Sequence, residues 1–479
     1  MLRTKVTEEK MYYGLTLDSL VPQDHFLRLV DKHIDFDFIY SKVKKLYSHT
    51  GKPSIDPVVL IKMVLIGYLY NIKSERQLEK EIQVNLAYRW FIRYTLDETI
   101  PDHSTISQTR RRKFKGSGIF EELFENIVEQ CIKFGFVKGE TILTDATHIK
   151  ASASMDSLRE ITITPIDYLK QLDESIDGKS ENEEDSDSDS LKKHGKEHHY
   201  SNKTHRSTTD PDSRLVPSTS KRSGGLYYKE HRSIDSSGYI TDVHITHGNV
   251  TDSAPYLERL DYQRFRFKFP IRDVVADRGY GKNHIYKGLS DRRISAFIPS
   301  IVESRSDFER FFKKHFAYNY ESDEYTCPAG HVLRKKRTVP RKRDDCYEYA
   351  ARRTFCNAHC EFREQCTKGS ERSIRVVQRH MYQNYTDEQL SKRGSVKWRK
   401  LINLRKTIVE GSFGDAKTNH GLGRAKMRGF EGIREQSFMT AIAQNIKKLV
   451  KEIKKGGMGE AILSFRVLIQ EYFAAEFVF

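Results

Sequence analysis

Apolar positions in the first third of the chain recur at helical spacing. In "PSIDPVVLIKMVLIGYLYNIK", Pro53, Ser54 and Asp56 precede a long apolar run, and this pattern predicts a capped helix. The next segment, "SERQLEKEIQ", again places apolar residues on one helical face. "PDHSTISQTRRRKF" predicts a further helix that starts at Asp102 or Ser104. We therefore expect a helical domain over residues 1–135, and its basic cluster at residues 110–113 makes it a candidate DNA-binding domain.

A basic cluster ends that last helix, at Arg110, Arg111, Arg112 and Lys113. Arginines projecting from a short helix of a basic chain favour a contact with DNA. The alternative is the solvated charged face of a helical bundle, and the sequence leaves both open.

Polar residues dominate the stretch from 155 to 222. "DESIDGKSENEEDSDSDS" is acidic and serine-rich, and the residues after it carry almost no apolar side chains. Such segments bury too little surface to offset the entropy of ordering. We predict a largely disordered insertion that contains one short helix, "TPIDYLKQL", and a solvated acidic tract at 185–189.

Alternation typical of strands follows in "GLYYKEHRSIDSSGYITDVHITHG", where "DSSG" predicts the turn of a hairpin. A helix ("DSAPYLERLDYQRF"), a strand that ends at Asp277 ("IRDVVADRGYG") and another strand ("RISAFIPS") come next. Together with an earlier strand, "TILTDATHIKAS", this is the element order of a ribonuclease-H-like α/β fold. We expect its first part over residues 136–300.

Two helices are predicted near the end of the chain, "RKLINLRKTIVEGSFGDAKTNHG" and "EGIREQSFMTAIAQNIKKLVKEIKK". Steps of three and four make one apolar stripe of the second helix, formed by Phe438, Ile442, Ile446, Leu449 and Ile453. We assign residues 396–455 to the catalytic core and residues 456–479 to an amphipathic tail helix.

Charge and composition narrow the class of protein. The 479 residues carry a formal net charge of +16, which favours a polyanionic partner such as nucleic acid. A run of about 18 apolar residues, as a membrane span requires, is absent from the sequence, and the start lacks a secretory signal. We expect a cytoplasmic, nucleoid-associated protein without a membrane partner.

Three acidic residues invite a common explanation. Asp145 and Asp277 each follow a short apolar run that reads as a buried strand, and Glu410 lies on the first of the two late helices. Three converging carboxylates would repel one another unless divalent cations such as Mg²⁺ or Mn²⁺ lay between them. Two such ions suit an in-line phosphodiester displacement. The alternative for Glu410 alone is a helix-surface ion pair with Lys406.

The Glu410 helix carries further candidates. Lys406, Gly414 and Lys417 share its face with Glu410, so cations would flank the acid next to a phosphate backbone. We expect the following residues to contact DNA: Lys406, Lys417, Arg424 and Arg428.

Five motifs occur in one order: "TDATHIKASAS", "STTDPDS", "HITHGNVTDSAP", "VVADRGYG" and "IVEGSFGDAKTNHGLGRAKMRG". Together they resemble a bacterial insertion-sequence transposase of the DDE type, and the resemblance covers most of the chain. It implies a ribonuclease-H-like core with Asp145, Asp277 and Glu410 as the catalytic, magnesium-binding triad. It also implies double-stranded DNA with terminal inverted repeats, a target DNA, and a homodimer in the active complex.

Some family positions differ or carry no assigned chemistry. Relatives have a Tyr, an Arg and a Lys around the Glu; Lys417 matches the last, while Asn403 and Lys406 occupy the earlier positions. Lys406 keeps the positive charge but lacks the planar fork of Arg. Turn and cap roles are expected for four further motif residues, namely Asp210, Asp212, His247 and Asp252.

Five of the six cysteines lie between residues 327 and 366. In a protein outside oxidising compartments, such clustering favours tetrahedral zinc over disulfides. We expect a zinc-ribbon-like insertion over residues 301–395, with Cys327, Cys356, Cys360 and Cys366 as ligands and His331 or His359 as substitutes. Reduced cysteines without metal are the alternative. The nearby run "RKKRTVPRKR" fits a DNA-backbone contact or a solvated loop equally well.

These interpretations lead to one function. We expect a transposase that binds the ends of its insertion sequence, cleaves DNA with divalent metal and joins the 3′-hydroxyl ends to target DNA. A metal-dependent nuclease of the same fold and a non-catalytic, transposase-derived DNA-binding protein are the alternatives.

Overall fold

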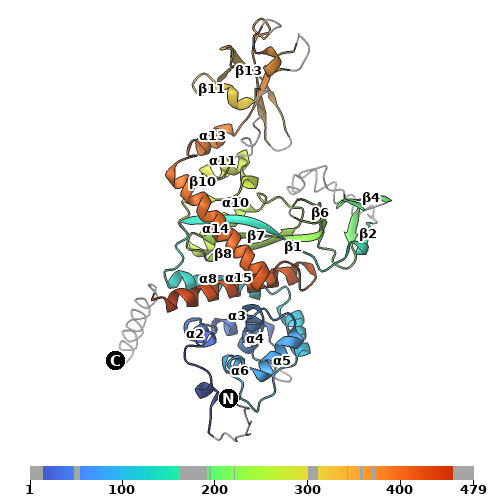
Figure 1. The fold of residues 1–479 in the computed structure, drawn as a ribbon, viewed down its shortest axis with the longest axis vertical. Helices are drawn as coiled ribbons and strands as arrows, with labels where there is room; N and C mark the ends of the chain where they lie inside the picture. The colour runs from blue at the N-terminus through green and yellow to red at the C-terminus, as the bar shows by residue number, and fades with distance from the viewer. Residues whose placement is uncertain are drawn as a thin grey trace, which may run out of the picture.

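The protein is elongated, with its three parts arranged one above the other (Figure 1). Helices from the N-terminal third lie at one end, a mixed sheet lies in the middle, and a small cysteine-bearing sheet lies at the other end. The computed structural model describes residues 14–47, 54–161, 191–193, 196–220, 222–299, 311–341, 344–356, 360–367 and 373–456.

The central sheet is built around β1 (Thr141–Lys150). On one side β1 pairs antiparallel with β7, which pairs antiparallel with β8; on the other it pairs parallel with β9, which pairs parallel with β10. The strand order is therefore β8-β7-β1-β9-β10, with β6 also on β7. This is the ribonuclease-H-like arrangement that the element order predicted. The other bounds are β6 Arg214–Val216, β7 Gly225–Asp235, β8 Ile240–His247, β9 Asp273–Val275 and β10 Ser295–Phe297.

The predicted hairpin of β7 and β8 turns at "DSSG". Asp235 accepts hydrogen bonds from the backbone N–H and the hydroxyl of Ser237, and the Gly238 N–H donates to the Asp235 carbonyl at 2.7 Å. Gly238 has φ of +89°, a conformation that side chains with a Cβ rarely adopt. The turn joins β7 to β8, where Ser233 stands opposite Asp242. On its other side β7 pairs with β1, and there Arg232 stands opposite Asp145.

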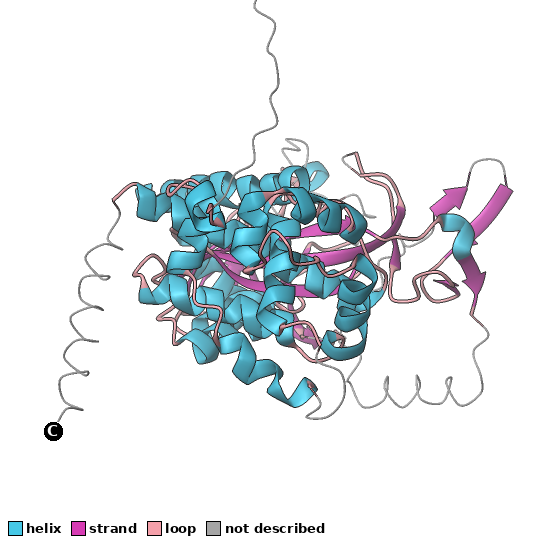
Figure 2. Cartoon of the chain, turned by 90° about the horizontal axis from the view of Figure 1, so that it is seen from below, coloured by secondary structure: helices cyan, strands magenta, loops and turns pink. Residues whose placement is uncertain are grey.

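Helices pack around this sheet. α14 (Val396–Asn419) crosses it, and α15 (Gly429–Lys454) runs between the sheet and the N-terminal helices (Figures 1 and 2). All five residues of the predicted stripe on α15 are buried, which confirms that prediction. α15 contacts α8 and α4 as well as β8, so its burial extends well beyond one stripe. The remaining core helices are α10 Tyr256–Phe267, α11 Asn283–Asp291 and α13 Gln383–Ser391.

The N-terminal third is helical, as predicted. Asp56 accepts hydrogen bonds from the N–H groups of Val58 and Val59, and Asp102 accepts from Ser104 at 2.7 Å. These side chains cap two helices at the positions that the sequence indicated. The helices are α1 Leu17–Leu20, α2 Phe26–His33, α3 Phe38–Val43, α4 Pro57–Leu69, α5 Glu75–Val84, α6 Leu86–Ile92, α7 His103–Thr109 and α8 Ile119–Lys133.

The DNA contact expected for the basic cluster is wrong for Arg110. Residues Arg110–Phe114 form a π-helix, and the Arg110 guanidinium forms ion pairs with Glu75 of α5 and Glu435 of α15. Its side chain is only 12% exposed, because the two carboxylates hold it at the boundary between the N-terminal helices and α15. Arg111 and Arg112 remain exposed.

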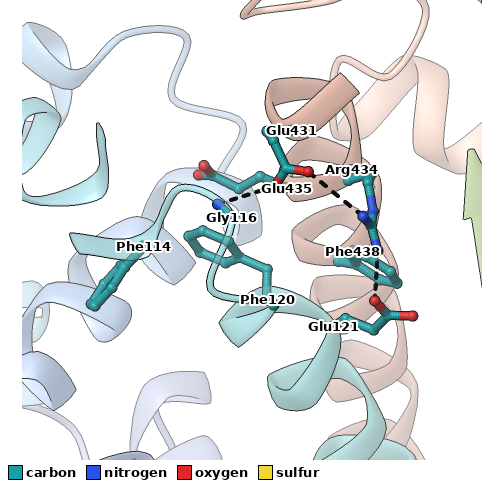
Figure 3. Close-up of a pocket in the computed structure, with 9 residues that line it drawn as sticks. Phe114, Gly116, Phe120, Glu121, Glu431, Arg434, Glu435 and Phe438 are labelled. Carbon is teal, nitrogen blue, oxygen red and sulfur yellow. Dashed lines mark hydrogen bonds and ion pairs between the residues drawn. The ribbon is translucent and has the colours of Figure 1, made fainter. Parts of the chain in front are cut away.

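Further contacts join the same two parts around a pocket (Figure 3). Arg434 of α15 pairs with Glu121 of α8 at 2.7 Å, and the Gly116 N–H donates to Glu431 at 3.3 Å. The rings of Phe124 and Phe438 lie 5.6 Å apart beside them. Polar and aromatic contacts therefore fasten the N-terminal helices to the long helix under the sheet.

The disordered insertion predicted over residues 155–222 is wrong for its second half. β5 (His205–Ser207) pairs with β2 (Leu158–Glu160), and β6 joins the central sheet. Side-chain hydrogen bonds replace the missing apolar surface; Asn202, for example, bonds both backbone groups of Leu215. β3 (Leu191–Lys193) and β4 (Lys196–Tyr200) form a separate ladder. The predicted helix "TPIDYLKQL", the acidic tract and nearly all of the predicted tail helix lie outside the described residues.

The cysteine-bearing segment forms an antiparallel sheet of its own, in the order β11-β12-β13-β14-β15. The run "RKKRTVPRKR" lies largely on exposed β13, where Arg334 and Arg337 pair with Glu324 and Glu348. Within the described part of the chain, none of the helices is long and apolar enough to cross a membrane. The bounds are β11 Ala317–Asn319, β12 Glu324–Thr326, β13 Val332–Val339, β14 Cys346–Ala350, α12 Arg363–Cys366 and β15 Val376–His380.

Candidate active site

Two of the predicted acids lie at matching levels of neighbouring strands. β1 and β9 run parallel with Leu143 opposite Val275. Asp145 follows two residues later on β1, and Asp277 follows two residues after the end of β9. Parallel strands bring such positions to the same part of the sheet. The negative charge of Asp277 acts on the Asp145 carboxyl and helps to raise its pKa. The structure thus brings together two residues 132 positions apart in sequence.

Asp145 is held by an arginine that sequence reasoning missed. Arg405 of α14 donates a hydrogen bond to its Oδ2 at 2.8 Å, and the Ala146 N–H donates to its Oδ1 at 2.8 Å. The Asp145 side chain is 21% exposed. Burial raises its pKa above the ordinary value, and the Arg405 charge opposes that shift. Asp145 is therefore a partly desolvated carboxylate whose charge is stabilised by a neighbouring arginine.

Asp277 stands at the point where the chain leaves the sheet. β9 ends at Val275, and Asp277 caps a short 3₁₀ helix, Arg278–Tyr280, by accepting a hydrogen bond from the Gly279 N–H at 2.8 Å. This bond fixes the direction of the carboxylate, since one oxygen is bound to the turn. The turn sequence "DRGYG" therefore explains why the acid is positioned at the sheet edge.

Glu410 lies on α14 and is exposed. It falls between Arg405, which binds Asp145, and Lys417, whose pKa also responds to the charge of Asp145. Glu410 therefore lies at the level of Asp145 along the helix. Among the described residues, no hydrogen bond or ion pair joins Glu410 to either aspartate, so the convergence of all three acids stays a prediction.

The residues expected to contact DNA are exposed, as that role requires. Lys406 and Lys417 lie on α14 on either side of Glu410. Arg424 follows α14 and pairs through its backbone with Lys150 at the end of β1. Arg428 stands at the start of α15. Burial lowers the pKa of Lys417, and the charge of Glu230 opposes that effect.

A buried ion pair fixes α14 on the sheet. Glu230 and Arg232 of β7 are both 0% exposed, and their charged groups are 2.6 Å apart. Arg232 also donates hydrogen bonds to Ser412 of α14 at 2.8 Å and to Gln444 of α15 at 2.9 Å. Its guanidinium lies over the ring of Phe413. Because Ser412 is two residues from Glu410, this contact helps to determine where Glu410 stands.

Three of the four remaining motif residues act in a cap, as expected. The N–H groups at the start of α15 donate to Asp210 from Gly429 and to Asp212 from Phe430, each at 3.1 Å. His247 Nδ1 is 2.7 Å from the Asp212 carbonyl oxygen, to which it donates. The motifs around "TTDPDS", "HITHG" and "KMRGF" therefore meet to hold the start of α15.

Asp252 lies in a turn, as expected, but its side chain does not cap a helix. α10 has Pro255 at its N-cap, and the Asp252 carboxylate instead pairs with Lys229 of β7 at 2.7 Å. Its other oxygen faces Gly279, next to Asp277. Sequence patterns over neighbouring residues could not predict this contact, because Lys229 is 23 positions away. The only indication in the sequence was that Asp252 belongs to one of the five motifs.

The four cysteines chosen as zinc ligands line one pocket together with His331. Burial raises the pKa of the Cys366 thiol, and the proximity of the other three cysteines adds to that shift. Backbone N–H groups donate to sulfur, from His331 to Cys327 at 3.3 Å and from Arg375 to Cys356 at 3.4 Å. Cys346 stands apart at the start of β14, and His359 lies outside the described residues.

Close grouping of metal-ligand atoms occurs elsewhere in the described chain. Among the described residues, one set of three or more possible metal ligands has its ligand atoms within 4.8 Å of one another, and it consists of Glu79, Asp102 and His103. The cysteine sulfurs do not form such a set, so they stand further apart in this structure. His103 bonds Glu79 through its ring and its backbone N–H, and Arg76 donates to the other ring nitrogen. Because Arg76 occupies the ring nitrogen that a metal would need, we interpret this group as a set of contacts that hold the start of α7.

Comparisons with known proteins found two matching domain families. Residues 15–112 match a transposase domain (DUF772), and residues 326–450 match a transposase DDE domain, which includes Glu410 but neither aspartate. No curated protein matches the chain. Among solved structures, the cryo-EM structure of a piggyBac transposase synaptic complex with hairpin DNA aligns at a TM-score of 0.35 and 9% identity, over 93% of this chain and 82% of that one. The two domain matches, on either side of a ribonuclease-H-like sheet, identify the chain as a DDE-type transposase.

Proposed function

We propose that this transposase binds the ends of an insertion sequence, cleaves them with divalent metal and joins the 3′-hydroxyl ends to target DNA. The observation that carries the proposal is that Asp145 and Asp277 each come two residues after a matched pair, Leu143 and Val275, on neighbouring parallel strands. The helix that bears Glu410 packs against both strands. Acids from two strands and a helix, once brought together, would have the donor set of a hard cation.

The residues present suit Mg²⁺ or Mn²⁺. Asp145, Asp277 and Glu410 would hold the ions through carboxylate oxygens, and the arginine on Asp145 shows that this carboxylate is held next to a positive charge. Bound there, divalent ions would activate the attacking oxygen and stabilise the leaving oxygen of a phosphodiester displacement.

The chain itself would orient the DNA. Lys406 and Lys417 flank Glu410 on α14, and the exposed Arg424 and Arg428 continue the basic surface toward α15. Cations in this arrangement contact phosphates without reading sequence. They would hold a DNA backbone against the edge of the sheet where Asp145 and Asp277 lie.

We also propose that the cysteine-bearing sheet binds one zinc ion through Cys327, Cys356, Cys360 and Cys366. The shared pocket and the N–H bonds to two sulfurs support this set. Zinc binding would draw the four sulfurs closer than they stand here, as tetrahedral ligation requires.

Glu410→Gln tests the catalytic role, with Lys417→Ala as its matched control on the same helix. Glu410→Gln keeps the side-chain shape and removes the charge that would hold the cation. DNA binding should therefore persist, while the rates of cleavage and strand transfer should fall by several orders of magnitude, as is usual when a catalytic group is removed. Lys417→Ala should weaken binding across sequences and lower the salt slope by about one.

A gel assay of both variants on end-bearing DNA, with a target plasmid present, reads binding, cut ends and joined products separately. Normal cleavage by Glu410→Gln would make Glu410 a surface residue and refute the proposed triad. Cut ends without joined products from the wild-type chain would favour a nuclease.

A further inference from the structure

A fourth acid, Asp252, borders the same site. It lies in the loop between β8 and α10, and its Oδ1 is bound by Lys229, whose ammonium also donates to the Val250 carbonyl. Lys229 is 7% exposed, and the Asp252 side chain is 29% exposed. A buried lysine thus holds one oxygen of a carboxylate that still reaches solvent.

The second oxygen of Asp252 faces Asp277 across a glycine. A Cβ placed on Gly279 would lie 3.0 Å from Asp277 Oδ1 and 3.7 Å from Asp252 Oδ2. The two carboxylate oxygens therefore border one small space that is open only because residue 279 has no side chain. Two acids would repel each other there unless a cation lay nearby.

A buried hydroxyl lies within the electrostatic reach of the same acids. Tyr280 is 0% exposed, and its Oη has no hydrogen-bond partner among the described residues. The charges of Asp252, Asp145 and Asp277 all act on this side chain. A buried hydroxyl whose hydrogen has no acceptor costs folding free energy. The Tyr280 hydroxyl is therefore suited to donate a hydrogen bond to a group that binds at this site.

We propose that Asp252 is a further ligand for the divalent cation, through the oxygen that Lys229 leaves unbound. The inference rests on the proposed function, since it adds a fourth carboxylate to the site of Asp145 and Asp277. Lys229 occupies only Oδ1, so Oδ2 near Gly279 and Asp277 is the oxygen available to a cation.

Direct titration of the full-length, metal-free chain with Mn²⁺ by calorimetry tests this without relying on activity. Asp252→Asn should weaken Mn²⁺ binding about tenfold or more, at least the effect of losing a group that supports a ligand. Lys229→Met, the matched control, removes the ion pair but keeps the carboxylate, so its affinity should fall much less than that of Asp252→Asn. Gly279→Ala fills the space between the two oxygens and should weaken binding with all four acids intact.

The outcomes separate this inference from the proposed function. Equal losses in Asp252→Asn and Lys229→Met would show that the pair only stabilises the fold, and would overturn the inference. Unchanged affinity in Asp252→Asn, with a clear loss in Asp145→Asn, would also overturn it while leaving the proposed function intact. Unchanged affinity in Asp145→Asn as well would remove the proposed metal site itself. Circular dichroism of each variant establishes that it is folded.

Discussion

Arg232→Met tests how α14 is held in place. Arg232 pairs with Glu230 inside β7 and reaches across to Ser412 of α14 and Gln444 of α15. Met has a similar length and no charge, so the substitution leaves the Glu230 carboxylate buried without its partner. The same change also releases the contact nearest to Glu410.

The magnitude follows from burial. Both side chains of the pair are 0% exposed, and breaking a buried pair from one side costs about 3–5 kcal/mol of unfolding free energy. Removing both charges leaves no buried ion without a partner. The double variant Glu230→Gln with Arg232→Met should therefore be more stable than Arg232→Met alone, with a coupling free energy of about 1–3 kcal/mol.

Urea unfolding of the wild-type chain, both single variants and the double variant measures this coupling, with intrinsic tryptophan fluorescence as the signal. Trp398 lies on α14 and reports on that helix. Strand transfer should fall in Arg232→Met, because α14 loses its contact with the sheet, and recover only in part in the double variant. A loss below about 1 kcal/mol in Arg232→Met, the range of an exposed pair, would refute the buried pair and its role in placing α14.

Two further predictions concern metal and pH. Purified wild-type chain should hold about one zinc per molecule by elemental analysis, and the double variant Cys356→Ser with Cys360→Ser should hold none; zinc-free protein prepared without chelator would contradict the proposed cysteine site. Burial raises the pKa of Asp145 above its ordinary value of 3.8, so its ionised form is disfavoured in the native chain. Without divalent metal, Asp145→Asn should therefore raise the melting temperature at pH 7, and the gain should fade as the pH falls from the raised native pKa toward 3.8. A variant that melts below the wild-type chain at pH 7 would show that Arg405 outweighs burial.

Local patterns were enough for the elements that depend on near neighbours. The stripe on α15, the turn at "DSSG" and the caps at Asp56 and Asp102 all occur where the sequence indicated. Periodicity reports which side of an element is buried, and capping needs only the next two or three residues. The order of these elements then indicated the ribonuclease-H-like sheet, and with it the positions of Asp145 and Asp277.

Predictions from polar residue content were wrong where a polar side chain bonds to a residue far away in the sequence. Arg110 read as a surface cation, yet Glu75 and Glu435 bury it from 35 and 325 positions away. The polar stretch around Asp210 read as disordered, yet that residue is fully buried and caps α15. Residue composition indicates how much apolar surface a segment can bury. It does not show which hydrogen bonds the segment forms with other helices and strands.

The sequence by itself determined most of the helices, the hairpin, the order of the main strands and the residue types expected of a DDE-type transposase. Only the tertiary structure decided that Arg405 binds Asp145 from 260 positions away, and that Asp252 lies beside Asp277 with Lys229 behind it. The physical reason is the distance along the sequence over which each effect acts. Hydrophobic periodicity depends on residues within one or two helical turns, whereas the charge around a carboxylate depends on the helices and strands that the fold packs against it.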